Sequence, residues 1–437
     1  MRIAMPTFLV KGTPTPAPLW LAGFIATLVF AFSNIYFKKV SGIAEPLLAL
    51  LGFWCVFRYG SGLARSVAFN FLWAALAIQL LSWAGSQFSH PELAEPYPKL
   101  DRLARLFLFL LLAWWLGGQT RNVFIFWTVA AAGLLISPWV LGFGHTEMLQ
   151  GFKGSRIDLD IRNAQHPALL YGSLLIGLVV FLPRILKTFK PWSVLPWALV
   201  FALTVAVVVF TQTRAVWSGL VIVIIAAPVA LILLNYRKVS RKSAITLVLL
   251  IVAALAALTV TISQVAPQRI FAEQSSVRLV LDGDFENLPY SSIGTRIHSW
   301  RAGLELAAQH PFIGWGGNAR EYALAQVGWV PDEKAERFQH LHNSYLELLV
   351  QYGLIGLAWY LLLLGWLAKS TLSAWKKGNI PGDVALFFAL FLVFWSWANL
   401  FESYLGFWTG ELLINLVCAG MVTLIWKDRF RKLEAGQ

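Results

Sequence analysis

The segment HLHNSYLELLVQYGLIG, residues 340–356, joins a polar stretch to a long apolar one. From Tyr345 onward almost every residue is apolar, whereas the entrance holds His340, His342 and Asn343. An apolar run of about 20 residues is enough to cross a bilayer. The segment therefore predicts a membrane helix that carries polar side chains at its mouth.

The whole chain has the composition of a membrane protein. Of its 437 residues, 58% are hydrophobic and 13% are charged, against about 45–50% and about 25% in soluble proteins. Apolar runs of spanning length lie at 19–36, 43–58, 67–85, 103–118, 122–143, 167–183, 192–211, 215–235, 244–264, 345–368, 384–401 and 405–426. We predict an all-α, polytopic protein of about twelve transmembrane helices. The first nine occupy residues 1–264, a large loop occupies 265–343, and three helices with a short basic tail occupy 344–437.

The placement of charge predicts the orientation in the membrane. Lysine and arginine cluster in alternate short connections and in the tail, and the net charge is +13. Short basic loops stay in the cytoplasm, so both termini are expected there. The connections 86–102, 144–166 and 265–343 then face outward and are large enough to hold a site. Because this surface faces away from the cytoplasm, a nucleic-acid partner is not expected.

Two stretches predict packing near the mouth of the helix. Residues 296–309 place apolar side chains at helical spacing, which predicts an amphipathic helix on the membrane surface or over the spans. Its expected apolar face contains Ile297, Trp300, Leu304 and Ala308. Further along, Gly353 and Gly356 lie on the face below His342, where they would let a neighbouring helix approach closely.

Several arginines break the charge pattern by lying on the predicted outer side. Arg214 occupies the short turn between the seventh and eighth spans, and Arg296 opens the amphipathic stretch. Arg102, Arg156 and Arg162 lie in the outward loops. Snorkelling or solvation explains each of them alone. Together, their planar donor groups suit the phosphate oxygens of a lipid-linked substrate or of lipid head groups.

His342 is a candidate general base. At a helix N-terminus the partial positive charge disfavours imidazolium, and a neutral imidazole is what a general base needs. The alternative is that His342 and Asn343 only cap the helix. Ser344 and Glu347 have capping-box spacing, so the helix is expected to begin at Ser344 or Asn343.

The sequence gives no positive signal for a metal or cofactor. The His340–His342 pair and the acidic pairs of the loops do not form a defined metal motif. The chain contains no P-loop and no dinucleotide fingerprint. We therefore predict neither a metal nor a nucleotide nor another cofactor.

His342-Asn343, followed after nine residues by Gly353-Leu-Ile-Gly356, resembles the signature of the bacterial O-antigen ligase/polymerase family. HPFIGWGGN (310–318), TQTRAVW around Arg214 and GTRIHSW around Arg296 are similar to further stretches of that family. The resemblance covers most of the chain in architecture, and in sequence mainly residues 205–220 and 290–356.

The resemblance implies a GT-C-type glycosyltransferase of the bacterial inner membrane, multi-pass, with its active site facing the periplasm. Such an enzyme passes a polysaccharide from undecaprenyl pyrophosphate to a sugar hydroxyl of lipid A-core, with inversion and without a metal. Arg214 and Arg296 would hold the pyrophosphate, and His342 would take the proton from the acceptor hydroxyl. The residues expected to bind substrate are Asn343, His340, Arg102, Arg156 and Arg162.

Other functions stay open at this point. O-antigen polymerases and protein O-oligosaccharyltransferases belong to the same family and use the same donor class. The latter often carry additional sequence after the last span, whereas this chain ends shortly after Trp426, which favours the ligase. A transporter usually shows repeated halves with polar breaks in mid-span, and here the polar residues gather on one face instead.

Overall fold

The computed structural model describes residues 15–60, 62–189, 194–235, 273–331, 333–334 and 340–434, and every regular element in these ranges is a helix. Seven of the described helices are long and apolar enough to cross a membrane. They are α3 (Lys38–Tyr59), α4 (Val67–Ser89), α7 (Thr120–Val140), α9 (Gln165–Phe189), α11 (Arg214–Asn235), α18 (Ser344–Lys376) and α20 (Trp408–Ile425). Three shorter apolar helices accompany them: α2 (Ala17–Ser33), α10 (Val194–Phe210) and α19 (Gly382–Ala398).

These helices confirm a polytopic membrane protein, whereas the predicted total number of spans stays a prediction. The span expected at 244–264 lies outside the described residues. The span expected at 103–118 is broken, because α5 (Asp101–Ala104) and η2 (Arg105–Phe107) precede a short α6 (Leu108–Leu116).

The centre of the molecule is built on α6 and α20. Every residue of α6 is buried, and α20 is buried along most of its length. Asn415 of α20 bridges the break before α6. Its Oδ1 accepts a hydrogen bond from the Phe109 amide at 2.7 Å, and its Nδ2 donates to the Arg105 carbonyl at 2.8 Å. Backbone N–H and C=O groups that lose their helical partners away from water need other partners. Asn415 supplies them at the break and so fixes the course of the chain from α5 into the core.

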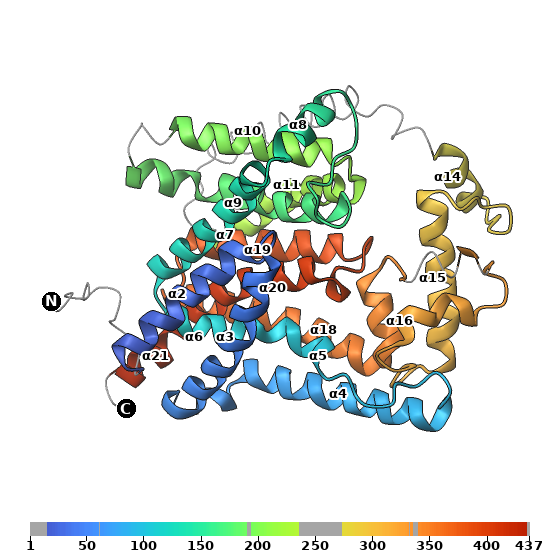
Figure 1. Ribbon diagram of the computed structural model, residues 1–437, viewed down its shortest axis with the longest axis horizontal. Helices are drawn as coiled ribbons and strands as arrows, with labels where there is room; N and C mark the ends of the chain where they lie inside the picture. Colours follow the sequence, from blue (N-terminus) through green and yellow to red (C-terminus); the bar gives the residue numbers. More distant parts are fainter. Residues whose placement is uncertain are drawn as a thin grey trace.

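The long connections gather at one end of the helices. In Figure 1, α14 (Gln274–Leu281), α15 (Ser292–Gln309) and α16 (Ala319–Tyr322) lie at the right, and α21 (Lys427–Glu434) lies at the left, near the start of α2. The predicted orientation places the end with α14, α15 and α16 on the periplasmic side and α21 in the cytoplasm.

Helix α15 packs against α18 and thereby covers the end of the spans. Of the predicted apolar face, Trp300 packs against a buried apolar cluster that includes Ala302, Leu306 and Ala307, whereas Leu304 and Ala308 are exposed. The buried residues are Gly294, Thr295, His298, Ser299, Ala302, Gly303, Leu306 and Ala307. A Cβ built on Gly303 would come within 2.7 Å of Leu346 of α18. The two helices approach closely at Gly303, and apolar side chains of α15, Ala302 and Leu306, belong to the same buried cluster as Leu346 of α18.

Helix α18 is interrupted at Gly353, whose φ of 63° and ψ of −164° are not helical. The segment 310–318 fills the interruption. A Cβ built on Gly353 would lie 2.2 Å from the carbonyl of Phe312, and one on Gly356 would lie 2.3 Å from the side chain of Tyr352 in the same helix. The expected approach of a neighbouring helix is therefore wrong, since Gly353 accommodates an inserted loop instead.

The inserted loop satisfies the backbone groups that the interruption removes from the helix. The Trp315 amide donates to the Val350 carbonyl at 2.8 Å, and the Gly316 amide donates to the Gln351 carbonyl at 3.1 Å. Ser82 Oγ of α4 also donates to the Gln351 carbonyl, at 2.7 Å. Irregular backbone at membrane depth is tolerated where protein satisfies it in this way, so the loop ties α15 and α16 to α18.

Replacing Gly353 by alanine is expected to destabilise the protein. A side chain in this backbone region costs about 1–3 kcal/mol, and the contact with the Phe312 carbonyl adds to it. The midpoint of thermal unfolding in detergent measures the effect. Gly365 of the same helix is the matched control, because a Cβ there meets nothing within 4 Å. Equal midpoints for Gly353→Ala and Gly365→Ala would contradict the role assigned to the interruption.

Candidate active site

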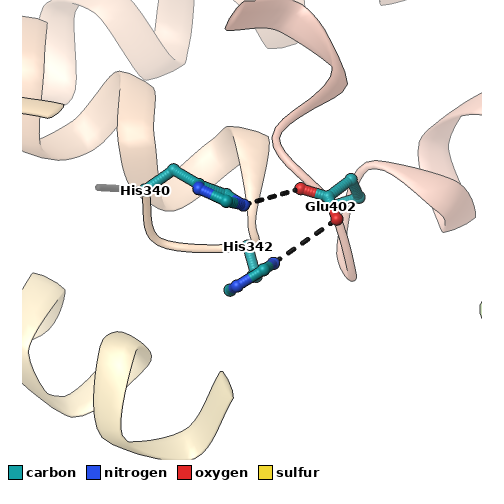
Figure 2. A group of neighbouring side chains, drawn as sticks. All are labelled: His340, His342 and Glu402. Carbon is teal, nitrogen blue, oxygen red and sulfur yellow. Dashed lines mark hydrogen bonds and ion pairs between the residues drawn. The ribbon is translucent and has the colours of Figure 1, made fainter. Parts of the chain in front are cut away.

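Two histidines at the mouth of α18 meet one buried carboxylate. His340 Nε2 lies 3.2 Å from Glu402 Oε1, and His342 Nδ1 lies 3.4 Å from Glu402 Oε2. The two imidazole rings have centroids 4.0 Å apart. Only 1% of the Glu402 side chain is exposed. Figure 2 shows both rings directed at the carboxylate, and the three residues are called the histidine–glutamate cluster below.

The start of α18 fixes the two histidines. Asn343 is the N-cap, and its Oδ1 accepts hydrogen bonds from the amides of the second and third residues after it at 3.0 and 3.1 Å. Glu347 reaches back and accepts from the Leu341 amide, between the histidines, at 3.1 Å. The helix begins at Ser344 as predicted. His342 itself has a φ of 50°, a left-handed conformation that is uncommon outside glycine and that clusters at functional sites.

Glu402 reaches the cluster from the connection between α19 and η5 (Tyr404–Gly406). Ser344 joins this connection to α18, because its Oγ donates to Asn399 Oδ1 at 2.6 Å and its amide donates to the Asn399 carbonyl at 2.9 Å. The Ser403 amide donates to Glu402 Oε1 at 2.9 Å. The carboxylate is therefore held by the same contacts that pack the last two apolar helices onto α18.

The cluster favours a Glu402 carboxylate beside a neutral His342. Burial raises the pKa of the Glu402 carboxyl, but hydrogen bonds from His340 and His342 outweigh burial and hold that pKa well below its usual range. Burial lowers the pKa of His342. Glu402 opposes this shift, and His340 and Arg296 reinforce it. A neutral His342 donates a hydrogen bond from Nδ1–H to Glu402, so its basic lone pair is on Nε2. That nitrogen points away from Glu402 (Figure 2).

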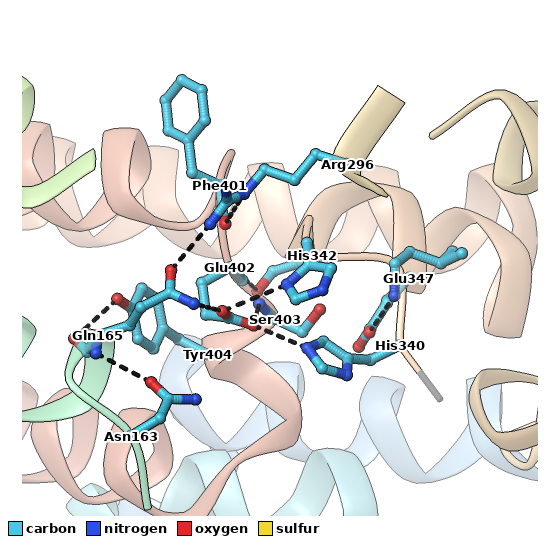
Figure 3. Close-up of polar contacts among 12 residues, drawn as sticks. Asn163, Gln165, Arg296, His340, His342, Glu347, Phe401, Glu402, Ser403 and Tyr404 are labelled. Carbon is cyan, nitrogen blue, oxygen red and sulfur yellow. Dashed lines mark hydrogen bonds and ion pairs between the residues drawn. The ribbon is translucent and has the colours of Figure 1, made fainter. Parts of the chain in front are cut away.

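Arg296 of α15 reaches the cluster through Gln165. Its Nε donates to the Phe401 carbonyl at 3.1 Å, and its Nη2 donates to Gln165 Oε1 at 3.2 Å. Gln165 Nε2 in turn donates to Glu402. Figure 3 shows Arg296 and His340 on opposite sides of the His342 ring. The guanidinium is thus tied to the residue before Glu402 and, through Gln165, to the Glu402 carboxylate. It also lies within electrostatic reach of His342.

Burial lowers the pKa of Arg296, and Arg214 lies close enough to reinforce this shift. Arg214 is the first residue of α11, and its Nη2 donates to Glu273 Oε1 at 2.7 Å. Glu273 Oε2 accepts from the Ile293 amide at 2.6 Å, near the start of α15. Burial raises the pKa of Glu273, but the hydrogen bonds from Arg214, Ile293 and Ser291 lower it overall. One carboxylate therefore joins the turn that carries Arg214 to the helix that carries Arg296.

The other predicted residues occupy different positions. Arg156 Nε donates to the Thr211 carbonyl at 2.9 Å and supports the turn before Arg214. The guanidinium of Arg162 lies 3.9 Å from the ring centre of Phe407. Arg102 donates to the Gly317 carbonyl in the inserted loop. These contacts are structural, and the assignment of Arg102, Arg156, Arg162, His340 and Asn343 to substrate binding stays a prediction.

A cavity of about 550 Å³ adjoins the histidine–glutamate cluster. Its lining includes His340 but not His342. Polar and charged groups from α5, η2, α18 and α20 line it together with aromatic rings. They include Arg102, Arg105, Arg162, Glu347, Gln351 and Trp408. Three arginines with an indole and hydrogen-bonding groups suit a phosphorylated or sugar-bearing group.

Two residues of this site were not assigned from the sequence. Glu402 is one of several carboxylates in or beside the predicted spans, and the sequence predicted a role for neither Glu402 nor Gln165. Carboxylates within membrane segments are functional candidates by default. The usable signal for Glu402 was its place in the last outward connection, on the same predicted side as His340 and His342.

Comparison with known proteins finds a family match for the central segment of the chain. Residues 199–361 match the family model described as O-antigen ligase, which confirms the resemblance predicted from the sequence. This segment includes Arg214, Arg296, His340 and His342, whereas Glu402 lies beyond it. An uncharacterized protein of Haemophilus influenzae is 31% identical over 146 residues, which are 33% of this chain and 35% of that protein. The match therefore spans about a third of the length of this curated relative.

Proposed function

We propose that this protein is an O-antigen ligase of the bacterial inner membrane. It transfers a polysaccharide from undecaprenyl pyrophosphate to a sugar hydroxyl of lipid A-core on the periplasmic side. The match of residues 199–361 to the O-antigen ligase family supports the reaction class. The observation that carries the mechanism is the pairing of His342 with the buried Glu402, beside Arg296.

His342 is the general base. The acceptor hydroxyl gives its proton to His342 Nε2 while its oxygen attacks the anomeric carbon of the donor sugar. The bond from that carbon to the pyrophosphate oxygen breaks, and the electron pair leaves with the pyrophosphate. Attack opposite the leaving group inverts the anomeric configuration. Glu402 holds the Nδ1 proton of His342 and stabilises the imidazolium that forms, as carboxylates do beside catalytic histidines.

Arg214 and Arg296 stabilise the leaving group. Charge accumulates on the pyrophosphate as the glycosidic bond breaks, and preorganised cations there lower the barrier. Both arginines are held in place, Arg214 by Glu273 and Arg296 by Gln165 and the Phe401 carbonyl. Burial of Arg296 strengthens its interaction with an anion, because the local dielectric is low. The activated donor supplies the free energy, so the reaction needs no nucleotide, metal or other cofactor.

The membrane setting fits two lipid-linked substrates. The donor carries a polyprenyl chain and the acceptor carries acyl chains, so both reach the site from the bilayer. The cavity beside His340 lies between α18, α20 and the α5–η2 segment. It offers arginine and aromatic groups for the phosphates and sugars of one of them.

Glycan transfer by purified protein in detergent tests the proposed function. The donor is undecaprenyl-pyrophosphate O-antigen, the acceptor is lipid A-core, and a chelator is present throughout. Formation of lipopolysaccharide is expected. Folded protein that transfers glycan to a pilin-like peptide but not to lipid A-core would identify a protein O-oligosaccharyltransferase. Chain extension of the donor without any acceptor would identify a polymerase.

Replacing Arg296 by alanine is expected to lower the turnover number in this assay by about 10²–10³-fold, the usual effect of removing one donor that stabilises a developing charge. Arg296→Lys is expected to rescue little, because one ammonium cannot reproduce the separate bonds from Nε and Nη2. Arg301→Ala is the matched control on an exposed position of the same helix. If the turnover number of Arg296→Ala equals that of the control, Arg296 does not stabilise the leaving group.

A further inference from the structure

We propose that the histidine–glutamate cluster is also an inhibitory binding site for Zn²⁺. The nitrogen and oxygen atoms that His340, His342 and Glu402 direct at one another all lie within 4.8 Å. Two imidazoles and one carboxylate are a ligand set that zinc favours. The inhibition, though not the binding, rests on the proposed role of His342 as general base.

The separations in the cluster suit a zinc ion. Zinc–nitrogen and zinc–oxygen bonds of about 2.0–2.2 Å in tetrahedral geometry place neighbouring ligand atoms about 3.3–3.5 Å apart. The two histidine nitrogens lie 3.2 and 3.4 Å from the Glu402 oxygens. Hydrogen bonds to a carboxylate are usually shorter, about 2.7–2.9 Å when charge-assisted. Each nitrogen faces a different oxygen of Glu402, and the candidate ligand atoms all lie within 4.8 Å of one another.

The surroundings supply the other properties of a metal site. The Ser403 amide and the Gln165 carboxamide donate to the Glu402 oxygens and orient the carboxylate, as outer contacts do around bound metals. The ring of Phe407 lies edge-on to His340 with centroids 5.4 Å apart. His340 lines the cavity of about 550 Å³, which gives an ion a route to the buried carboxylate. Water completes the coordination from the cavity side.

Zinc bound in this way blocks the general base by fixing the wrong tautomer. His342 coordinates through Nδ1 only after that atom has lost its proton, and a neutral ring then carries its proton on Nε2. Nε2 is the atom that accepts the acceptor's proton in the proposed mechanism. A zinc-bound His342 therefore cannot act as base, although the substrates still have access to the arginines.

Zinc titration by calorimetry tests the site directly. The full-length protein, purified without a polyhistidine tag and stripped of metal, is titrated with ZnCl₂ and separately with MgCl₂. Wild type is expected to bind zinc and not magnesium, which prefers oxygen ligands. His340→Gln is expected to bind zinc at least about tenfold more weakly, because even the loss of an outer contact costs that much. His145→Gln, at an exposed histidine outside the cluster, is the matched control.

The transfer assay then tests inhibition. Zinc is expected to abolish transfer over the concentration range in which it binds, and chelator is expected to restore it. The inhibitory concentration should rise by the same factor in His340→Gln, measured against that variant's own metal-free rate. Equal zinc affinity in wild type and His340→Gln, or full transfer by zinc-saturated protein, would overturn the proposal. If the protein transfers glycan to no acceptor, the proposed function fails while the calorimetry still decides the metal site.

Discussion

Replacing His342 by alanine is expected to lower the turnover number for glycan transfer by about 10²–10⁴-fold, the range that positioned general bases contribute. The lone pair on Nε2 is lost, and the acceptor hydroxyl must then attack with its proton still bound. The measurement is initial-rate formation of lipopolysaccharide by purified protein at saturating donor and acceptor. The matched control is His145→Ala, at an exposed histidine away from the site.

The backbone at His342 calls for a second variant. Its φ of 50° is left-handed, and alanine tolerates that conformation less well than asparagine does. His342→Asn keeps a short polar side chain in the same backbone conformation but has no basic nitrogen. It is expected to unfold at the wild-type temperature and to lose transfer as completely as His342→Ala. Full activity in a well-folded His342→Asn protein would return His342 to a structural role at the start of the helix.

The orientation rule and capping chemistry predicted much of the region around the site. Arg102, Arg162, Arg214 and Arg296 were singled out because they lie in connections predicted to face outward, against the positive-inside trend. The start of α18 followed from the polar residues before an apolar run, and the structure places it at Ser344. These signals are local in sequence, so they can be recognised without knowledge of tertiary contacts.

The contact between His342 and Glu402 was not predictable in the same way. It joins residues 60 positions apart, and the span expected at 384–401 ran past the actual end of α19 at Ala398. The residues next to Glu402 in the sequence do not show whether its carboxylate hydrogen-bonds to a histidine or is only hydrated. Its contact with His342 depends on the packing of the last outward connection onto α18, which is a tertiary contact.

The packing prediction at Gly353 was wrong, and the one for α15 held only in part. Hydrophobic periodicity identifies faces that avoid water, and the buried face of α15 combines apolar residues such as Leu306 with a close approach at Gly303. At Gly353 the absence of a Cβ allows a left-handed backbone and the close approach of an inserted loop rather than of a neighbouring helix. A glycine permits close approach by any backbone, so its presence alone does not say which element approaches.

Replacing Glu402 by glutamine is expected to lower the turnover number by about 10²–10⁴-fold, without removing any atom that touches substrate. The reason is the tautomer of His342. The carboxylate accepts hydrogen bonds from His340, His342, Ser403 and Gln165, whereas an amide offers one acceptor oxygen and a donor NH₂ group. An NH₂ group facing His342 favours the tautomer with the proton on Nε2, and the comparable change beside other catalytic histidines costs about 10⁴-fold.

The pH profile of the residual activity separates this role from a structural one. A general base works above its pKa, so transfer is expected to fall as the pH drops through the pKa of His342, which burial places below the ordinary value. Glu402 raises that pKa, so Glu402→Gln should move the acid limb to lower pH while the rate on the plateau falls. Glu286→Gln, at an exposed glutamate between α14 and α15, should leave both the acid limb and the plateau unchanged. A variant that only loosened the fold would lower the plateau and leave the acid limb in place. Such an unshifted limb would argue that Glu402 packs the last connection but does not set the protonation of His342.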